Sequence, residues 1–400
     1  MPDSPVLRPI TAGAILNVYN PMTQRFSRHI SLAVRIALSA LAFCLYDGNA
    51  TAQGRYSVRE VKNPAFRPSQ IFFRFEDIAS APFNELRRRF AFAEAVKGVD
   101  DEFERILRLR QWIFRTLKVD PSKPNPPADA ISILAQGPSG GPFECSHAMI
   151  AQNAVMNAMG YLTRCLQPGP GGEENTYLAA GNHGVNEIWS NKHRKWFISD
   201  AEFDGHFEKG GIPLSALEIR DEFLKDGARQ VDLVVGPERK KVQPRLLFSP
   251  HCYRFVAYEL AGDRHTQAGW SSGALAVWED DYFKTHTWYR WGTPDGGKAR
   301  EHWAVRQNAF LRVPHRDWIE WTPNVIGLRA VIKGNIAQVR LQSHTPSLDR
   351  LEMRAPGGRW DRTGASFDLP LEGSRVEREF RSVNVAGVAG PVSRLVIERE

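Results

Sequence analysis

Three short stretches in the middle of the chain carry most of the information about its fold and chemistry. They are GPFECSHA at residues 141–148, HGVNEIW at residues 183–189 and KWFISD at residues 195–200. The turn-rich first stretch leads into a run of small and apolar residues, which predicts a helix that begins at Cys145. Alternating apolar residues in the other two stretches predict a two-stranded hairpin with its turn near Asn191.

This arrangement would bring a thiol, an imidazole and a carboxylate together. His183 begins one predicted strand and Asp200 ends the next, so hairpin pairing places these two ends side by side. Asp200 would accept a hydrogen bond from one imidazole nitrogen, and the other nitrogen would face Cys145. The positive end of a helix favours a thiolate at that position. The residues therefore predict a nucleophile, a base and an orienting carboxylate.

The segment resembles the transglutaminase-like superfamily, which has a papain-like core with Cys, His and Asp in this order on the same elements. The resemblance covers about residues 100–205, a quarter of the chain. The matching positions are Cys145, Gly160, Arg164, His183, Glu187, Trp196 and Asp200. Two departures lie beside the site: Gly184 and Val185 follow the histidine where the family has Ala-Trp, and residues 169–181 form a long polar loop. These departures leave the substrate preference open.

The fold expected from the resemblance and from the strand pattern is α+β. The resemblance implies a helix-supported antiparallel sheet, and we expect this transglutaminase-like catalytic domain over residues 53–235. Charge and proline cluster in residues 236–244, which predicts a linker. Seven of the eleven tryptophans then set off a Trp-rich β-region at residues 245–325. Short strands and turns over residues 326–400 predict a small fibronectin- or immunoglobulin-like β-sandwich that ends the all-β part of the chain.

The first 52 residues have the layout of a secretory signal peptide. Three arginines precede an apolar run at residues 36–45, and small residues up to Ala52 follow it. The run is shorter than the roughly 20 residues of a membrane span. We therefore expect cleavage after Ala52, a periplasmic or secreted protein and no stable membrane span, with Met1 and Met22 both open as the start.

Composition excludes several classes of protein. The chain is 42% hydrophobic and 24% charged, which is ordinary for a globular protein and unlike a disordered or collagen-like chain. Its net charge of +7 is mild and its signs are interleaved, so we expect no nucleic-acid partner. Four cysteines are too few for a disulfide scaffold. Cys165 and Cys252 are expected either to pair or to be two buried thiols.

No metal and no organic cofactor is expected. Two histidines and two aspartates follow one another near the site, but their spacing matches no known ligand set. They are His183, Asp200, Asp204 and His206. The calcium dependence of some members of the superfamily has no visible counterpart in an acidic ligand loop.

Each member of the predicted triad has an alternative. Cys145 could be a structural thiol of the core. The alternative bases are His147, which points to a different helix face, and His193, which lies at the far end of the hairpin. The alternative carboxylates are Glu202 and Asp204.

Three further residues are candidates for substrate binding. Arg164 is typical of the superfamily, and a strand-face salt bridge is its structural alternative. Tyr177 and Trp189 are expected to line the cleft, with a place in the core as the alternative.

The leading functional prediction is an exported cysteine-dependent acyl-transfer enzyme. It would act on peptide or carboxamide bonds of a protein or peptide substrate, as a peptidase or amidase or as a protein-glutamine acyltransferase, with hydrolysis and transamidation both open. The alternative is a non-catalytic surface module with a transglutaminase-like scaffold, whose Trp-rich region and β-sandwich bind glycan or protein. The Trp-rich region would then contact cell-envelope glycan, unless its tryptophans fill a β core. A polysaccharide-active enzyme with paired carboxylates is a third option, but no such pair stands out.

Overall fold

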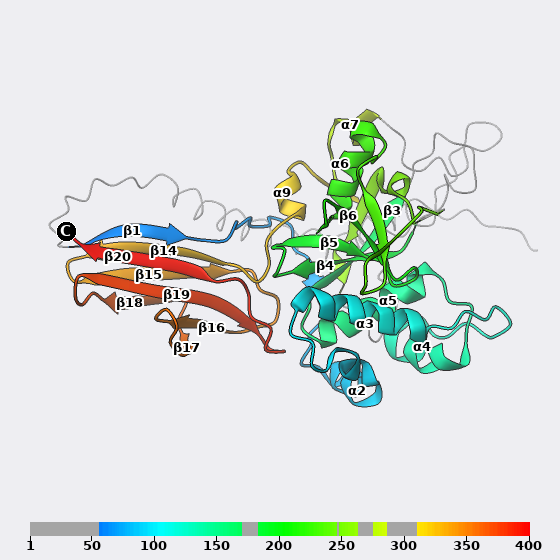
Figure 1. Ribbon diagram of the computed structural model, residues 1–400, viewed down its shortest axis with the longest axis horizontal. Helices are drawn as coiled ribbons and strands as arrows, with labels where there is room; N and C mark the ends of the chain where they lie inside the picture. Colours follow the sequence, from blue (N-terminus) through cyan, green and yellow to red (C-terminus); the bar gives the residue numbers. More distant parts are fainter. Residues whose placement is uncertain (1–55, 170–182, 246–247, 263–274, 286–309) are drawn as a thin grey trace, which may run out of the picture. The chain divides into compact units, whose positions relative to one another are not determined.

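The computed structural model describes residues 56–169, 183–245, 248–262, 275–285 and 310–400. The predicted signal peptide, Tyr177 and four of the seven clustered tryptophans lie outside the described residues. The described part is a mixed α+β structure with several sheets (Figure 1). None of its helices is both long and apolar enough to cross a membrane.

A six-stranded sheet forms the centre of the part of the fold that holds Cys145. Its order is β13-β12-β10-β3-β4-β5, and every neighbouring pair is antiparallel except β12 and β13. The strands are β3 (Thr163–Gly169), β4 (Val185–Ser190), β5 (Lys195–Ser199), β10 (Phe255–Glu259), β12 (Leu275–Trp278) and β13 (Phe310–Val313). β4 and β5 form the hairpin predicted from the sequence.

The hairpin buries both of its faces. Ile188 pairs with Phe197 and belongs to the hydrophobic cluster under the helices, while the neighbouring pair of Trp189 and Trp196 belongs to the cluster on the opposite face. Successive side chains of a strand point to opposite faces, so this register orients every residue of the hairpin. In the same register Asn186 faces Ser199, which places the residues before β4 next to those after β5.

Helices cover the Ile188 face of the sheet. They are α2 (Ala81–Arg89), α3 (Glu102–Thr116), α4 (Ala130–Gln136) and α5 (Cys145–Ala158), with a 3₁₀ turn at Ala91–Val96. The sequence predicts α3 and α5 closely, and Asp101 caps α3 by accepting a 2.9 Å hydrogen bond from the backbone N–H of Glu104. α5 is buried on nearly all sides because it is built from small and apolar residues.

A four-stranded sheet of order β7-β6-β8-β9 follows the hairpin in sequence. Its strands are β6 (Gly205–Lys209), β7 (Ile212–Pro213), β8 (Asp232–Val235) and β9 (Lys240–Val242), and α6 (Ala216–Asp226) lies between β7 and β8 in the chain. The stretch predicted as a linker, residues 236–244, therefore contains a strand. Gly236 at φ +71° turns the chain so that Val235 pairs with Lys240.

Three of the described strands of residues 245–325, β10, β12 and β13, extend the central sheet. β10 lies between β3 and β12, so strands from this block continue the sheet that carries β4 and β5. Tyr258 of β10 and Trp321 are buried in the same hydrophobic cluster as Trp189. Three of the clustered tryptophans are described, and Trp321 fills this core.

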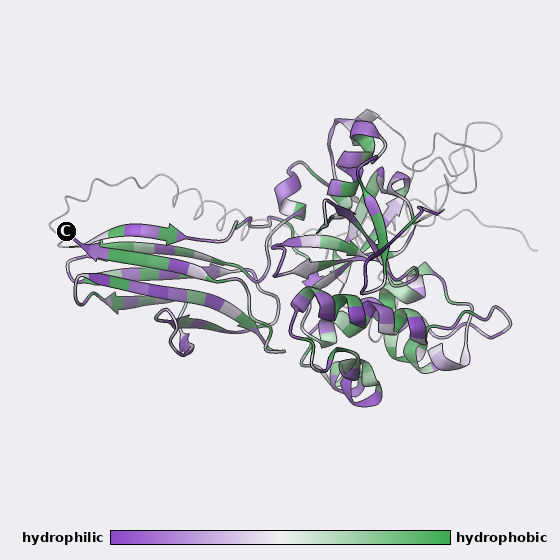
Figure 2. Cartoon of the chain, in the orientation of Figure 1, coloured by the Kyte–Doolittle hydropathy of each residue, from purple (hydrophilic) through white to green (hydrophobic). Residues whose placement is uncertain are grey.

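Eight further strands form two sheets around a separate hydrophobic cluster, as expected for a small sandwich. One sheet contains β1 (Tyr56–Lys62), β20 (Ser393–Arg399), β19 (Arg375–Asn384), β16 (Leu348–Arg354) and β17 (Asp361–Thr363), and the other contains β14 (Ile326–Lys333), β15 (Ile336–Ser343) and β18 (Ser366–Pro370). Hydrophilic and hydrophobic bands alternate along these strands (Figure 2). The strand β1 pairs with β20, so the sandwich includes residues from the predicted start of the catalytic domain.

In addition to 3₁₀ turns at Gly137–Ser139 and Pro250–Tyr253, four short helices and strands remain. They are β2 (Arg74–Phe75), β11 (Ala261–Gly262), α7 (Asp281–Thr285) and α9 (Arg316–Ile319). β2 and β11 pair with each other in parallel.

Candidate active site

Cys145 is the first residue of α5, and the preceding turn fixes its position. Gly140 has φ +90°, a conformation that favours glycine, and begins the approach to the helix. The Nδ1 atom of His147 accepts a 3.1 Å hydrogen bond from the backbone N–H of Glu144, which closes the first turn. The half-buried thiol therefore lies at the positive end of the α5 dipole.

The other two described cysteines, Cys165 and Cys252, are buried, and neither is in a disulfide bond. Asn186 donates a 3.4 Å hydrogen bond to Sγ of Cys165. Burial raises the pKa of the Cys252 thiol above its ordinary value. The sequence leaves open whether Cys165 and Cys252 form a disulfide or are two buried thiols, and in the structure they are two buried thiols. Cys145 is thus the most accessible thiol in the described part of the chain.

A short hydrogen bond joins His183 to Asp200. The Nε2 atom of His183 lies 2.5 Å from Oδ2 of Asp200, and both side chains are fully buried. The other carboxylate oxygen of Asp200 accepts hydrogen bonds from the backbone N–H groups of Glu202 at 2.9 Å and Phe203 at 3.3 Å. The carboxylate is therefore held from both sides, and it in turn fixes the plane of the imidazole ring.

The surroundings of His183 favour its charged form. Burial alone would lower the pKa of the imidazole, but the charge and the hydrogen bond of Asp200, together with the neighbouring Cys145, raise it well above its ordinary value. A protonated ring beside the thiol is the state in which a thiolate and an imidazolium form an ion pair.

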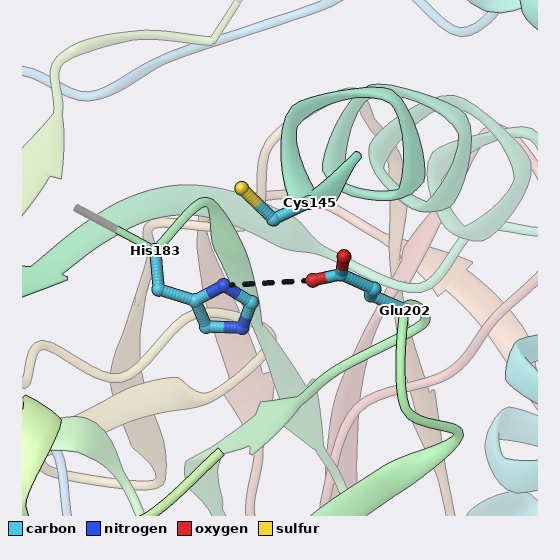
Figure 3. A group of neighbouring side chains, drawn as sticks. All are labelled: Cys145, His183 and Glu202. Carbon is cyan, nitrogen blue, oxygen red and sulfur yellow. Dashed lines mark ion pairs between the residues drawn. The ribbon is translucent and has the colours of Figure 1, made fainter. Parts of the chain in front are cut away.

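The carboxylate of Glu202 faces the Nδ1 atom of the His183 ring (Figure 3). Its Oε2 atom is 3.7 Å from Nδ1 of His183, and one ligand-type atom each from Cys145, His183 and Glu202 lies within 4.8 Å of those of the other two. Burial and the charges of Asp200 and Glu144 raise the pKa of Glu202 to about 7, although the His183 charge acts to lower it. The sequence singled out Glu202 only as an alternative to Asp200. The hairpin register sets the residues before β4 against those after β5. It is therefore the feature of the sequence from which the position of Glu202 beside His183 could have been predicted.

The two alternative bases have other contacts. His147 uses Nδ1 in the cap of α5 and packs edge-on against Phe143 with ring centroids 5.7 Å apart. His193 packs against Phe103 at 4.7 Å. Only His183 among the histidines of the described part is hydrogen bonded to Asp200.

Arg164 lies in the core. Its guanidinium binds the buried carboxylate of Glu187 at 2.5 and 2.9 Å and donates a 2.6 Å hydrogen bond to the carbonyl of Ile319. It also lies over the rings of Trp196 and Tyr258, at 4.2 and 4.5 Å from their centroids. The side chain is 2% exposed, so the predicted contact with substrate finds no support in this geometry, and the salt-bridge alternative describes what the structure has.

Trp189, the second candidate for substrate binding, lies in the hydrophobic core. Trp189 is buried against Trp196, and its indole N–H donates a 2.8 Å hydrogen bond to Oδ1 of Asn191. It therefore belongs to the core, which is the alternative given for it. Tyr177 lies outside the described residues.

A second buried polar network anchors the turn that follows Asp200. Nε of Arg110 donates to Asp204 at 2.9 Å and Nη1 lies 3.1 Å from Nδ1 of His206, whose Nε2 is 2.8 Å from Glu208. Arg239 completes the network with two 2.6 Å hydrogen bonds to Glu208. Asp204 and His206 therefore belong to this network, apart from the pair of His183 and Asp200.

The sequence contained a signal for this network that the prediction did not use. Arg110 occupies an inward position on α3, between Ile106 and Ile113, where an apolar residue would be ordinary. A charged side chain at such a position requires a buried partner.

Comparison of the chain with protein-family models and with curated proteins finds no match.

Proposed function

We propose that this protein is an exported cysteine-dependent acyl-transfer enzyme of the transglutaminase-like type. One observation carries the proposal. A thiol at a helix start lies beside an imidazole whose far nitrogen is held 2.5 Å from a buried carboxylate. Nucleophile, base and orienting group in that order are the working parts of covalent acyl transfer. Peptide or carboxamide bonds are the proposed substrates.

In the proposed reaction, Sγ of Cys145 attacks the carbonyl carbon and forms a carbon–sulfur bond, and the thiol proton resides on Nδ1 of His183. The carbonyl electron pair moves to oxygen, where the backbone N–H of Cys145 is one hydrogen-bond donor. When the oxyanion collapses, the carbon–nitrogen bond breaks and the imidazolium protonates the leaving amine or ammonia. Asp200 holds the ring throughout.

The thioester is resolved in the second half of the reaction. Water or an amine attacks the carbonyl carbon and gives a proton to His183, the carbon–sulfur bond breaks, and the thiolate recovers a proton from the ring. Water gives hydrolysis and an amine gives transamidation, and the same three residues perform both.

The test is selective alkylation of the reduced, folded protein with limiting iodoacetamide near pH 6. Cys145 should be modified first, because an ordinary thiol with a pKa of about 8.5 reacts slowly there. Cys165 and Cys252 serve as internal controls because they are buried. His183→Gln should slow the modification of Cys145. Equal, slow modification of Cys145, Cys165 and Cys252 would contradict the proposal and would favour a surface-binding module.

A further inference from the structure

Three metal-ligand side chains of different chemistry converge in the candidate active site. Cys145 comes from the start of α5, His183 from the residues before β4, and Glu202 from the turn after β5 (Figure 3). One ligand-type atom of each lies within 4.8 Å of those of the other two. Thiolate, imidazole and carboxylate together form a ligand set typical of Zn²⁺, whereas Mg²⁺ and Ca²⁺ prefer oxygen alone.

The imidazole is already oriented as a metal ligand. Its Nε2 atom is held 2.5 Å from Oδ2 of the buried Asp200. Its Nδ1 atom is buried and makes no hydrogen bond of ordinary geometry within the described residues. Zinc-binding histidines use this arrangement, in which a carboxylate fixes the ring from the side opposite the metal. This nitrogen points toward Cys145 and Glu202 and lies 3.7 Å from Oε2 of Glu202 (Figure 3).

The distances suit a tetrahedral ion after small movements. Ligand atoms about 2.0–2.3 Å from zinc stand roughly 3.3–3.7 Å from one another in a tetrahedron. Nδ1 of His183 and Oε2 of Glu202 are already 3.7 Å apart. The side chain of Glu202 is 31% exposed and is therefore able to turn toward the thiol, which is half-buried. Three protein ligands leave the fourth position to water.

We propose that Cys145, His183 and Glu202 bind Zn²⁺ and that the bound ion holds the enzyme inactive. The proton that the Cys145 thiol shares with Nδ1 of His183 leaves to solvent when both atoms bind the metal, and the ion then occupies the sulfur lone pair and the ring nitrogen that acyl transfer requires. The inhibitory part rests on the proposed function, because it presupposes that this thiol is the nucleophile. The binding part rests on the geometry alone.

The probe for binding is Co²⁺, followed by displacement with Zn²⁺. The full chain, freed of metal with a chelator, is titrated with Co²⁺, and a thiolate-to-cobalt absorption band is expected in the near ultraviolet. Zn²⁺ should abolish the band and slow the alkylation of Cys145 more than about tenfold. Glu202→Gln should weaken Co²⁺ binding by more than about tenfold, since even outer-shell partners of a metal contribute about 10–100-fold.

Glu144→Gln is the matched control. It removes the same charge next to Cys145 but takes away none of the three ligands, so binding should stay within about twofold of the unchanged chain. Cys145→Ser should remove the absorption band, which assigns the band to this thiol. Equal weakening by Glu144→Gln and Glu202→Gln would show a charge effect without ligation and would overturn the site.

The outcomes separate the two proposals. Fast alkylation of Cys145 with no cobalt band and no protection by Zn²⁺ overturns the metal site and leaves the acyl-transfer proposal standing. If the protein binds metal but Cys145 reacts no faster than a buried thiol, the proposed metal site stands and the acyl-transfer proposal is contradicted. An amidase activity that requires Zn²⁺ would overturn the inhibitory role.

Discussion

At the scale of single residues, the hydrogen bond between His183 and Asp200 leads to the first prediction. Asp200→Asn preserves the size of the side chain but removes the charge that holds and stabilises the imidazolium. We expect kcat/KM for an amide substrate to fall by about two to four orders of magnitude, because the ring loses its charged partner and its correct tautomer. Steady-state kinetics on the purified variant measures the effect.

His147→Gln is the control for that experiment. His147 is as close in sequence to Cys145 as any histidine, but its Nδ1 atom serves the helix cap. We expect its loss to lower the free energy of unfolding by about 1 kcal/mol, the usual contribution of a cap, with kcat/KM changed less than tenfold. A larger kinetic loss in His147→Gln than in Asp200→Asn would reverse the assignment of the base.

Arg164 provides a prediction about stability. It is buried with Glu187, and removing one partner of a buried ion pair leaves an uncompensated charge. We expect Arg164→Met to lower the free energy of unfolding by about 3–5 kcal/mol, measured by urea denaturation. Adding Glu187→Gln should recover part of the loss. If Arg164 instead contacts substrate, the single variant should raise KM with little change in stability.

At the scale of elements, local pairing was predictable from sequence and distant pairing was not. The alternation in residues 183–200 predicts the β4–β5 hairpin, because a short turn leaves one partner for each strand. The pairing of β3 with β10 joins residues about 90 positions apart, and a strand pattern does not specify so distant a partner. Arg110 escaped prediction for a related reason, since its partners lie in a turn and a strand far along the chain.

The network around Arg110 leads to a prediction about pH. Burial holds the pKa of His206 at about 4, although its hydrogen bond to Glu208 acts to raise it. The unfolded chain takes up this proton near pH 6.5, so the unfolded state binds more protons between pH 6.5 and pH 4. The contribution of His206 to the free energy of unfolding is therefore complete above pH 6.5. It is lost as the pH falls toward 4, and the loss is about 3 kcal/mol at most.

The measurement compares the unchanged chain with His206→Gln. Urea denaturation at pH 7, 5.5 and 4 gives the free energy of unfolding of each protein. The variant lacks the titrating ring, so its stability should fall less steeply over this window. The pKa of Glu208 is lowered from 4.5 to about 2, so this residue changes the free energy of unfolding only below pH 4.5. Most of the pH range compared here lies above that value. Parallel curves for the two proteins would contradict the prediction.

At the scale of the whole molecule, the strands of residues 245–325 matter for the site although they contribute none of its three proposed catalytic residues. β10 lies between β3 and β12 in the central sheet, and Tyr253, Val256 and Tyr258 are buried in the same hydrophobic cluster as Trp189. Burying a large apolar side chain contributes about 1.5–3 kcal/mol. Several such residues together equal a large share of the 5–15 kcal/mol that is typical of a folded domain.

We therefore expect a fragment of residues 63–235 to lack cooperative unfolding, because it exposes one edge of β3 and the core that β10 covers. A fragment of residues 63–325 keeps the whole central sheet and lacks both β1 and the strands that pair with it. It should unfold in a single transition in circular dichroism and retain fast alkylation of Cys145. If the shorter fragment unfolds cooperatively with Cys145 equally reactive, the block from 245 is dispensable, and the boundary predicted near residue 235 is the correct one for a folding unit.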